Sequence, residues 1–292
     1  MNSMSGSALV RRRRLNSVLW IGVCGVFATA VAVVLLLIMG YIVREGISAI
    51  SIPFLTRLPR PTGITGGGVA NGIVGTLIIV GIAAVMAFPV GVLVGTYLAV
   101  YAHRRLSQWL SFVADVLAGV PSIAIGIYAY TLLVEPFRHF SAFSASFAFA
   151  MLMIPLVVRA TEGAISLVPR ELREAATALG APEARVVLKV LVVAARPGIM
   201  TGLLLSLARV TGETAPLLFT AFGSQYWELS PAQPMAELSL QIFTYAISPY
   251  ADWHTQAWGG ALILILAVFV LSVLARLSVL FGREGRGYGG TA

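Results

Sequence analysis

The chain has 292 residues, of which 58% are hydrophobic and only 11% are charged, and its mean hydropathy is +0.90. A soluble domain carries roughly 25% charged residues, so this composition excludes an ordinary soluble protein and indicates an integral membrane protein. The net charge of +8 also fits nucleic-acid binding. We expect no nucleic-acid partner, however, because the basic residues gather in short segments between apolar runs, as membrane topology requires.

Six apolar runs are long enough to cross a bilayer, for which about 20 residues are needed. Backbone polar groups in lipid must be satisfied within the segment, so these runs are predicted to be helices. We expect an all-α polytopic membrane protein with spans at residues 18–43, 70–101, 107–134, 141–163, 197–222 and 257–281. The third and fourth spans are the least regular, because they contain Asp115, Pro121 and Pro155.

The first run follows four consecutive arginines at residues 11–14. Signal peptides share this order, but the run from 18 to 43 exceeds the 7–15 residues of a signal-peptide core. We therefore expect a basic tail at 1–17 and an uncleaved first transmembrane helix.

Proline and glycine are frequent in residues 44–69, which predicts an irregular loop. Residues 223–256 carry Trp227 and Trp253, which are typical of a loop at the membrane–water interface. A glycine- and arginine-rich tail follows at 283–292.

The distribution of basic residues predicts the orientation. With a cytosolic N-terminus, 14 of the 20 basic residues lie on the inner side and four on the outer side, as the positive-inside rule requires. Both termini and the polar segment at 164–196 are then cytosolic, and residues 44–69 and 223–256 are extracytoplasmic. The four outer arginines are Arg44, Arg57, Arg60 and Arg138, and two arginines, Arg159 and Arg209, remain inside predicted spans.

The cytosolic segment at 164–196 contains the run RELREAATAL, which ends at Gly180, and Pro182 suits the first turn of a second helix. We expect two short helices joined at Gly180, although a solvated loop whose charges only fix topology is the alternative. Glu174, Ala175 and Ala176, followed after three residues by Gly180, resemble the EAA loop of ABC-importer permeases.

That resemblance implies a coupling helix that docks into a groove of an ATP-binding subunit. The family pattern ends in I-x-L-P, whereas residues 190–193 read VLVV, so the bend that the proline provides falls to Pro197. The residues implied in ATPase coupling are Glu171, Glu174, Ala175, Ala176, Leu179 and Gly180.

Five stretches resemble the PstA family of phosphate-import permeases: GGGVANGIVGTL at 66–77, LAGVPSIAIG at 117–126, LREAATALGAP at 172–182, ARVTGETAPLLFTA at 208–221 and SPYADWHTQAW at 248–258. The resemblance covers residues 66–282. It implies the type I ABC-importer permease (MetI-like) fold, with a permease core at 70–282, in the bacterial inner membrane.

The resemblance also implies the partners: a homologous permease, PstC, a dimer of the ATPase PstB, and the extracytoplasmic phosphate-binding protein PstS. Inorganic phosphate would be the substrate, and membrane lipid would surround the spans. The alternatives are a permease for sulfate or molybdate, and a stand-alone channel or secondary transporter.

The predicted fifth span carries two charges, Arg209 near its centre and Glu213 four residues later. A charge at mid-bilayer costs about 2.5–3.5 kcal/mol on insertion scales, and residues four apart on a helix share a face and can pair. Pro216 leaves the carbonyl of Gly212 without its helical donor, which favours a kink.

A guanidinium group matches phosphate oxygens bidentately, so we expect Arg209 to contact phosphate in transit and Glu213 to hold or release Arg209 between states. The alternative is a structural ion pair between two permeases. The remaining predicted pathway residues are Thr211, Thr214 and Arg159, and Arg159 is placed where its side chain can reach the inner interface. Asp115 is a candidate partner for an arginine or for the homologous permease PstC.

The chain has no GxxxxGK[ST], HExxH or GxSxG motif, so we expect no enzyme activity and assign ATP hydrolysis to a partner. Its three histidines lack metal-ligand spacing, and we expect no metal or cofactor. A GxGxxG pattern at Gly285, Gly287 and Gly290 lies in the tail without a preceding strand, which excludes a dinucleotide site.

Overall fold

The computed structural model describes residues 4–284, and within this range it contains helices and loops but no named strand. The predicted tail at 283–292, with Gly285, Gly287 and Gly290, lies almost entirely outside the described residues. The helices are α1 (Met4–Gly46), α2 (Ile52–Thr56), α3 (Ala70–Val100), α4 (Arg105–Gly119), α5 (Ser122–Ala129), η1 (Tyr130–Val134), α6 (Glu135–Phe137), α7 (Ala142–Ser166), α8 (Arg170–Ala178), α9 (Glu183–Arg185), η2 (Val186–Leu191), α10 (Val192–Thr211), α11 (Leu217–Thr220), α12 (Leu238–Ala246) and α13 (Ala251–Glu284).

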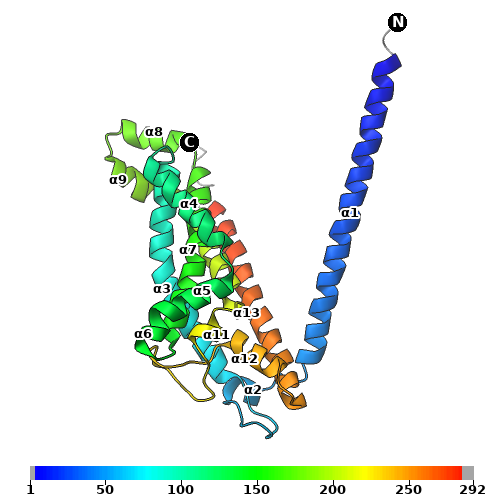
Figure 1. Ribbon diagram of the computed structural model, residues 1–292. Helices are drawn as coiled ribbons and strands as arrows, with labels where there is room; N and C mark the ends of the chain where they lie inside the picture. Colours follow the sequence, from blue (N-terminus) through cyan, green and yellow to red (C-terminus); the bar gives the residue numbers. More distant parts are fainter. Residues whose placement is uncertain (1–3, 285–292) are drawn as a thin grey trace.

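Five helices are long and apolar enough to cross a membrane, and α4 with the α5–α6 segment forms a sixth candidate that is broken. The all-α polytopic architecture expected from the sequence is therefore confirmed. The N-terminal end of α1, the C-terminal end of α13 and helix α8 lie at one end of the molecule, and α2 and α12 lie at the other (Figure 1).

Helix α1 stands apart from the other helices (Figure 1). It is longer than the predicted span at 18–43, because it starts at Met4 inside the predicted tail. The C-terminal end of α1 meets the first turns of α13, where the rings of Tyr41 and Trp258 pack edge to face with centroids 5.2 Å apart. There is no room for a side chain at Gly46, since a Cβ would lie 2.6 Å from the Trp258 carbonyl oxygen.

Helix α7 is the centre of the bundle, with α3 on one side and α10 on another. Gly91 and Gly95 of α3 let the two backbones approach, since added Cβ atoms would lie 2.5 Å from Val157 Cγ1 and from the Val158 carbonyl oxygen. Gly198 and Gly202 of α10 sit equally close to alanines of α7. In lipid, such close packing of small residues contributes much of the helix association energy.

The predicted third span is not one continuous helix. Helices α4 and α5 meet at an angle of 102°, and Val120 and Pro121 between them have extended backbone angles. Pro121 has no N–H and disfavours helical geometry at Val120, which ends α4 there. The sequence indicated that Pro121 makes this span irregular, but it did not give the size of the bend.

The predicted fifth span is wrong at both ends. Its helix runs without interruption from Glu183 to Thr211, so it begins earlier than residue 197 and ends before 222. Gly212 follows in a non-helical conformation, and Pro216 initiates the short helix α11 rather than kinking a long one. The sixth helix begins at Ala251 rather than 257, and α12 lies within the region predicted as a loop.

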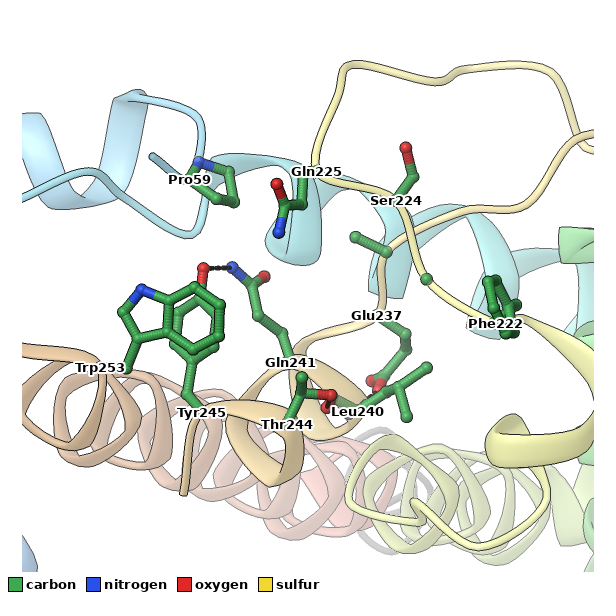
Figure 2. Close-up of a pocket in the computed structure, with 12 residues that line it drawn as sticks. Pro59, Phe222, Ser224, Gln225, Glu237, Leu240, Gln241, Thr244, Tyr245 and Trp253 are labelled. Carbon is green, nitrogen blue, oxygen red and sulfur yellow. Dashed lines mark hydrogen bonds between the residues drawn. The ribbon is translucent and has the colours of Figure 1, made fainter. Parts of the chain in front are cut away.

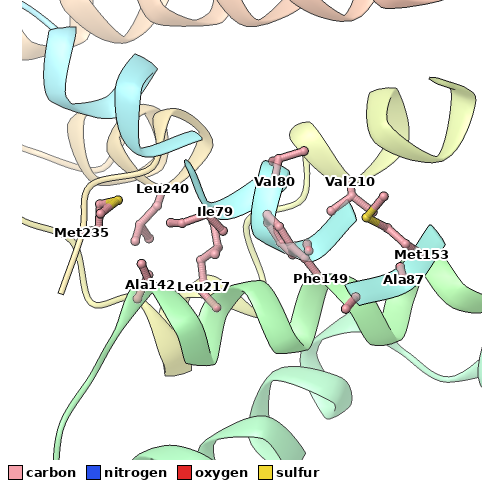
Figure 3. Packing of buried hydrophobic residues seen from close by; sticks show 14 residues of the cluster. Ile79, Val80, Ala87, Ala142, Phe149, Met153, Val210, Leu217, Met235 and Leu240 are labelled. Atoms are coloured by element: carbon pink, nitrogen blue, oxygen red, sulfur yellow. The ribbon is translucent and has the colours of Figure 1, made fainter. Parts of the chain in front are cut away.

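The segment after α10 is held by a buried apolar cluster (Figure 3). Leu217 of α11 belongs to the same cluster as Ile79 of α3 and Phe149 and Met153 of α7, and all four side chains are fully buried. Dense packing of this kind permits few alternative positions. It fixes where α10 ends relative to α3 and α7.

Candidate substrate cavity and coupling segment

A cavity of about 230 Å³ lies where the α4–α5 break meets α7 and the end of α10. Pro121 and Ser122 line it from the break, and Pro155 lines it from α7. Arg209 and Glu213 line it from α10 and the chain that follows. The cavity thus brings together two charged residues and two helix irregularities that are distant in the sequence.

Arg209 lies in the last turn of α10, not at the centre of a longer helix as predicted. A cation is favoured there, because the C-terminal end of a helix carries partial negative charge. Glu213 lies beyond the helix end, so the two side chains do not share a helix face. No ion pair joins them in residues 4–284, and the prediction that they pair is therefore not met in this conformation.

The N-terminus of α5, whose first residue is Ser122, also lines the cavity. Helix N-termini present unpaired N–H groups and favour anions. An arginine and a helix N-terminus therefore face one small space, and both have the electrostatic sign that an oxyanion needs.

The predicted threonines are placed differently. Thr211 is buried and its hydroxyl donates to the Leu207 carbonyl at 2.7 Å, and it lines a separate apolar cavity between α3, α10 and α13. Thr214 is half-buried in the turn after α10, where its carbonyl accepts from the Leu217 N–H. Neither hydroxyl is among the groups that line the cavity of Arg209.

Arg159 is fully engaged by its neighbours. Its Nε donates to Asp115 Oδ1 at 3.0 Å, Nη1 donates to Glu162 Oε2 at 2.6 Å, and Nη2 donates to the carbonyl and hydroxyl oxygens of Ser111. The predicted pairing of Asp115 with an arginine is confirmed. Arg159 thereby links α4 to α7. With Asp115 and Glu162 it forms a cluster of one guanidinium group and two carboxyl groups.

The segment at 164–196 has the predicted form of two helices, α8 and α9, joined at Gly180. Gly180 has a φ of +77°, which favours glycine, and it ends α8 by donating its N–H to the Thr177 carbonyl. Arg173 and Glu183 form an ion pair of 3.4 Å between the two helices. Leu179 at the tip is 89% exposed.

Helix α8 leaves most of the predicted coupling residues open to contact. Glu171, Glu174 and Ala175 are exposed and Ala176 is half-buried. A groove of about 760 Å³ runs between α8 and the end of α3, and Glu174 is part of its lining.

The sequence interpretation missed Glu237, which is fully buried at the start of α12. Its carboxyl group accepts hydrogen bonds from the Leu240 N–H at 3.0 Å and the Ser239 hydroxyl at 2.6 Å, and its other oxygen lies 3.1 Å from Thr76 Oγ. Burial raises the pKa of Glu237 to about 7, and these hydrogen bonds oppose the rise. An acidic residue directly before the apolar run LSLQIF was the available signal for a helix cap.

Glu237 also lines a cavity of about 210 Å³ near α2 and α12, shown in Figure 2. There Gln241 Nε2 donates to the Tyr245 hydroxyl at 3.1 Å, and the rings of Tyr245 and Trp253 stack with centroids 4.5 Å apart. No cation contacts Glu237 among the described side chains. This cavity is a poorer match for an oxyanion than the cavity of Arg209.

Comparisons with known proteins decide the family. Residues 91–280 match the family described as "Binding-protein-dependent transport system inner membrane component". The chain is 41% identical to the phosphate transport system permease protein PstA of Yersinia pestis, over 83% of this chain and 82% of that protein. This chain belongs to the PstA family.

Two further PstA relatives agree. The protein of Haemophilus influenzae is 43% identical over 81% of this chain and 84% of its own length. PstA 1 of Mycobacterium tuberculosis H37Rv is 41% identical over 72% of this chain and 69% of its own length.

The fold is also that of a solved ABC importer. A chain of the inward-facing MetNI methionine ABC transporter aligns with a TM-score of 0.64 and 20% identity, over 80% of this PstA-family chain and 99% of that chain. The expected MetI-like fold is therefore confirmed.

Proposed function

We propose that this chain is a permease subunit of an ATP-driven importer of inorganic phosphate. The observation that carries the proposal is the identity of 41–43% with phosphate transport system permeases over more than four fifths of the chain. The cavity of Arg209 supports it independently, because the guanidinium group of Arg209 has the charge and geometry that an oxyanion requires.

The chain would form the path with a homologous permease, PstC. The side chain of Arg209 is exposed in the isolated chain, so it is available both to the cavity and to a second subunit. Phosphate delivered by the binding protein PstS would enter from the end that carries α2 and α12. Arg209 and the N-terminus of α5 would hold the anion while Glu213, by like-charge repulsion, limits its residence.

Coupling would occur at α8 and α9, where an ATPase dimer, PstB, docks. The exposed face of α8 and the apolar tip at Leu179 supply the contact surface. Closure of the ATPase dimer would move this segment, which joins α10 directly through η2. The motion would therefore reach Arg209 along one continuous helix. Coupling of this kind needs the two states to differ in their contacts with the partner.

The orientation proposed with this function places both termini and α8 in the cytosol of a bacterial cell. Three features support it: the excess of basic residues on that side, the position of the N-terminal end of α1 and the C-terminal end of α13 at the same end of the molecule as α8 (Figure 1), and the docking requirement of α8. The proposed units are a tail at 1–17, a first span at 18–43, a loop at 44–69 and a permease core at 70–282.

Reconstitution of the complete assembly in proteoliposomes tests the proposal. ATP inside the vesicles should drive uptake of labelled phosphate only when the ATPase and the binding protein are present. Sulfate and molybdate should compete poorly. Strong competition by either ion would assign a different oxyanion, and ion-driven uptake by this chain alone would indicate a secondary transporter.

A further inference from the structure

Glu237 lies where three parts of the molecule meet: α3, α12 and the turn after α10. Its carboxyl group lies against Thr76 of α3 and against Ser239 of α12. The Ser239 hydroxyl also lies 3.3 Å from the carbonyl oxygen of Glu213. Ser239 has one hydroxyl hydrogen, and the shorter distance of 2.6 Å assigns it to Glu237. The carboxyl group is therefore linked to the turn that lines the cavity of Arg209 by one hydrogen bond to Ser239 and by the packing of Ser239 against the Glu213 backbone.

The hydrogen atoms around Glu237 can be counted from the distances. Thr76 has one hydroxyl hydrogen, and its nearest acceptor is the Gly72 carbonyl at 2.7 Å, compared with 3.1 Å to Glu237 Oε1. Its oxygen already accepts from the Leu238 N–H at 3.0 Å and has one lone pair left. If Thr76 donates to Gly72, its contact with Glu237 needs a hydrogen supplied by Glu237.

A protonated carboxyl group satisfies every atom of this network. Its O–H donates to Thr76 Oγ, while its other oxygen accepts from the Ser239 hydroxyl and the Leu240 N–H. An ionised carboxylate would instead draw the Thr76 hydrogen away from the Gly72 carbonyl, and it would remain as a buried charge without a cation partner. Both consequences are costly at a fully buried position.

Few other titratable groups bear on this site. From α12, Gln241 and Tyr245 line the adjacent cavity, and Tyr245 is titratable, with a pKa raised mainly by burial. From the turn after α10, Glu213 presents its backbone carbonyl, while its side chain lines the cavity of Arg209. From α3, Thr76 and Gly72 are uncharged.

We propose that Glu237 is a protonated tether that joins α3 to α12 and positions the Glu213 side of the cavity of Arg209. The effect on transport rests on the proposed function, whereas the protonation of Glu237 does not. Glu237 is a positioning residue, because it acts on the cavity through Ser239 and the Glu213 backbone.

Infrared difference spectroscopy on the reconstituted complex tests the protonation directly. Spectra of the natural protein minus Glu237→Gln should contain the carbonyl stretch of a protonated carboxyl group at pH 6, and the band should disappear as the pH rises past 8. Glu135→Gln is a matched control, because Glu135 is exposed and α6 lies at the same end of the molecule as α12 (Figure 1). Spectra of Glu135→Gln minus Glu237→Gln should still contain the band. Absence of the band at pH 6 would overturn the proposal even if phosphate transport proceeds normally.

Transport by variants tests the positioning role. Gln supplies the same donor and acceptor pattern as a protonated Glu, so Glu237→Gln should take up phosphate at close to the natural rate at pH 6. Glu237→Ala should lose about tenfold in rate, the kinetic equivalent of one lost buried hydrogen bond. The positioning role of Glu237 would be contradicted by an assembled Glu237→Ala complex that takes up phosphate at the rate of the unsubstituted protein. A tenfold loss of uptake rate in Glu237→Gln would contradict it as well.

A second pair of variants covers the case in which Glu237→Ala fails to assemble. Thr76→Val removes the acceptor of the proposed Glu237 hydrogen, whereas Thr76→Ser keeps it. The carbonyl band should shift in frequency in the valine variant and remain in place in the serine variant. Identical band positions in both variants would refute the Thr76 contact on which the tether depends.

Discussion

Gly126 of α5 packs directly against the backbone of Pro216, so closely that a Cβ on Gly126 would lie 2.6 Å from the Pro216 Cα. This contact fixes the helix after the α4–α5 break against the turn that follows α10. The two walls of the cavity of Arg209 are therefore set by a glycine and a proline that are distant in the sequence.

Gly126→Ala should separate these walls. No flexible side chain can give way, because the atom that meets the new methyl group belongs to the backbone, so we expect a loss of about 1–3 kcal/mol in stability and a reduced rate of uptake. Thermal unfolding in detergent and transport in proteoliposomes measure the two effects. Gly163→Ala in α7 is the control, since nothing lies within 4 Å of its added Cβ, and it should leave both unchanged.

Leu179→Asp should uncouple the permease from its ATPase. Leu179 is 89% exposed at the tip of the α8–α9 segment, so the substitution should leave the fold intact but place a charge in the docking surface. We expect at least a tenfold weaker association with the ATPase, equal to about 1.4 kcal/mol, measured by co-purification and by stimulated ATP hydrolysis.

Leu167→Asp is the matched control, because Leu167 is 85% exposed but precedes the helices α8 and α9. An unchanged ATPase association in Leu179→Asp would show that the tip of this segment does not dock.

The stability of the natural protein should depend on pH through Glu237. Burial, opposed by its hydrogen bonds, raises the pKa of this carboxyl group from 4.5 to about 7, so the folded state binds a proton more tightly than the unfolded state. The stability that this provides is present in full below pH 4.5 and is lost as the pH rises through about 7, by at most about 3 kcal/mol.

Thermal unfolding of detergent-solubilised protein between pH 5 and 8.5 measures this loss. The Glu237→Gln variant should lack the corresponding decrease, because its amide does not titrate. Parallel curves for the two proteins would argue against a titrating Glu237.

Substitutions of Arg159 and of its partner Asp115 should reduce the stability of the protein to different extents. Arg159→Leu leaves Asp115 and Glu162 without their shared cation, whereas Asp115→Asn leaves the pair of Arg159 with Glu162 in place. We expect the leucine variant to reduce stability clearly, and the asparagine variant to change it by less than about 1 kcal/mol, since the Asp115 side chain is 64% exposed. Equal losses of stability in the two variants, measured by thermal unfolding, would show that the Asp115 pair contributes most of the stability of this cluster.

The sequence predicted the membrane class, the number of apolar runs and the break at Gly180, because these depend on local composition and on single residues with strong backbone preferences. It did not predict that α10 ends at Thr211. The apolar run continues to Phe222, and periodicity does not show a turn that is stabilised by the tertiary packing of Leu217 and Ser239.

The same limit applies to the charged residues. Arg209 and Glu213 suggested a helical pair from their spacing, but the helix ends between them. The Arg159–Asp115 pair joins residues 44 positions apart, and spacing alone gives no preference for that partner over others. Glu237 was overlooked because a fully buried carboxylate is rare and its hydrogen-bond partner Thr76 lies on a different helix.

Uptake of labelled phosphate by the reconstituted assembly with Arg209→Gln is the most direct test of the central claim, that this cavity lies on the path of the anion. The assembly must first be shown to be intact by size-exclusion chromatography and by its content of ATPase. The account predicts at least a tenfold loss in the rate of uptake, partly restored in Arg209→Lys, which keeps the charge but lacks the bidentate geometry. An intact Arg209→Gln assembly that takes up phosphate at the rate of the unsubstituted assembly would contradict the claim that this cavity lies on the path of the anion.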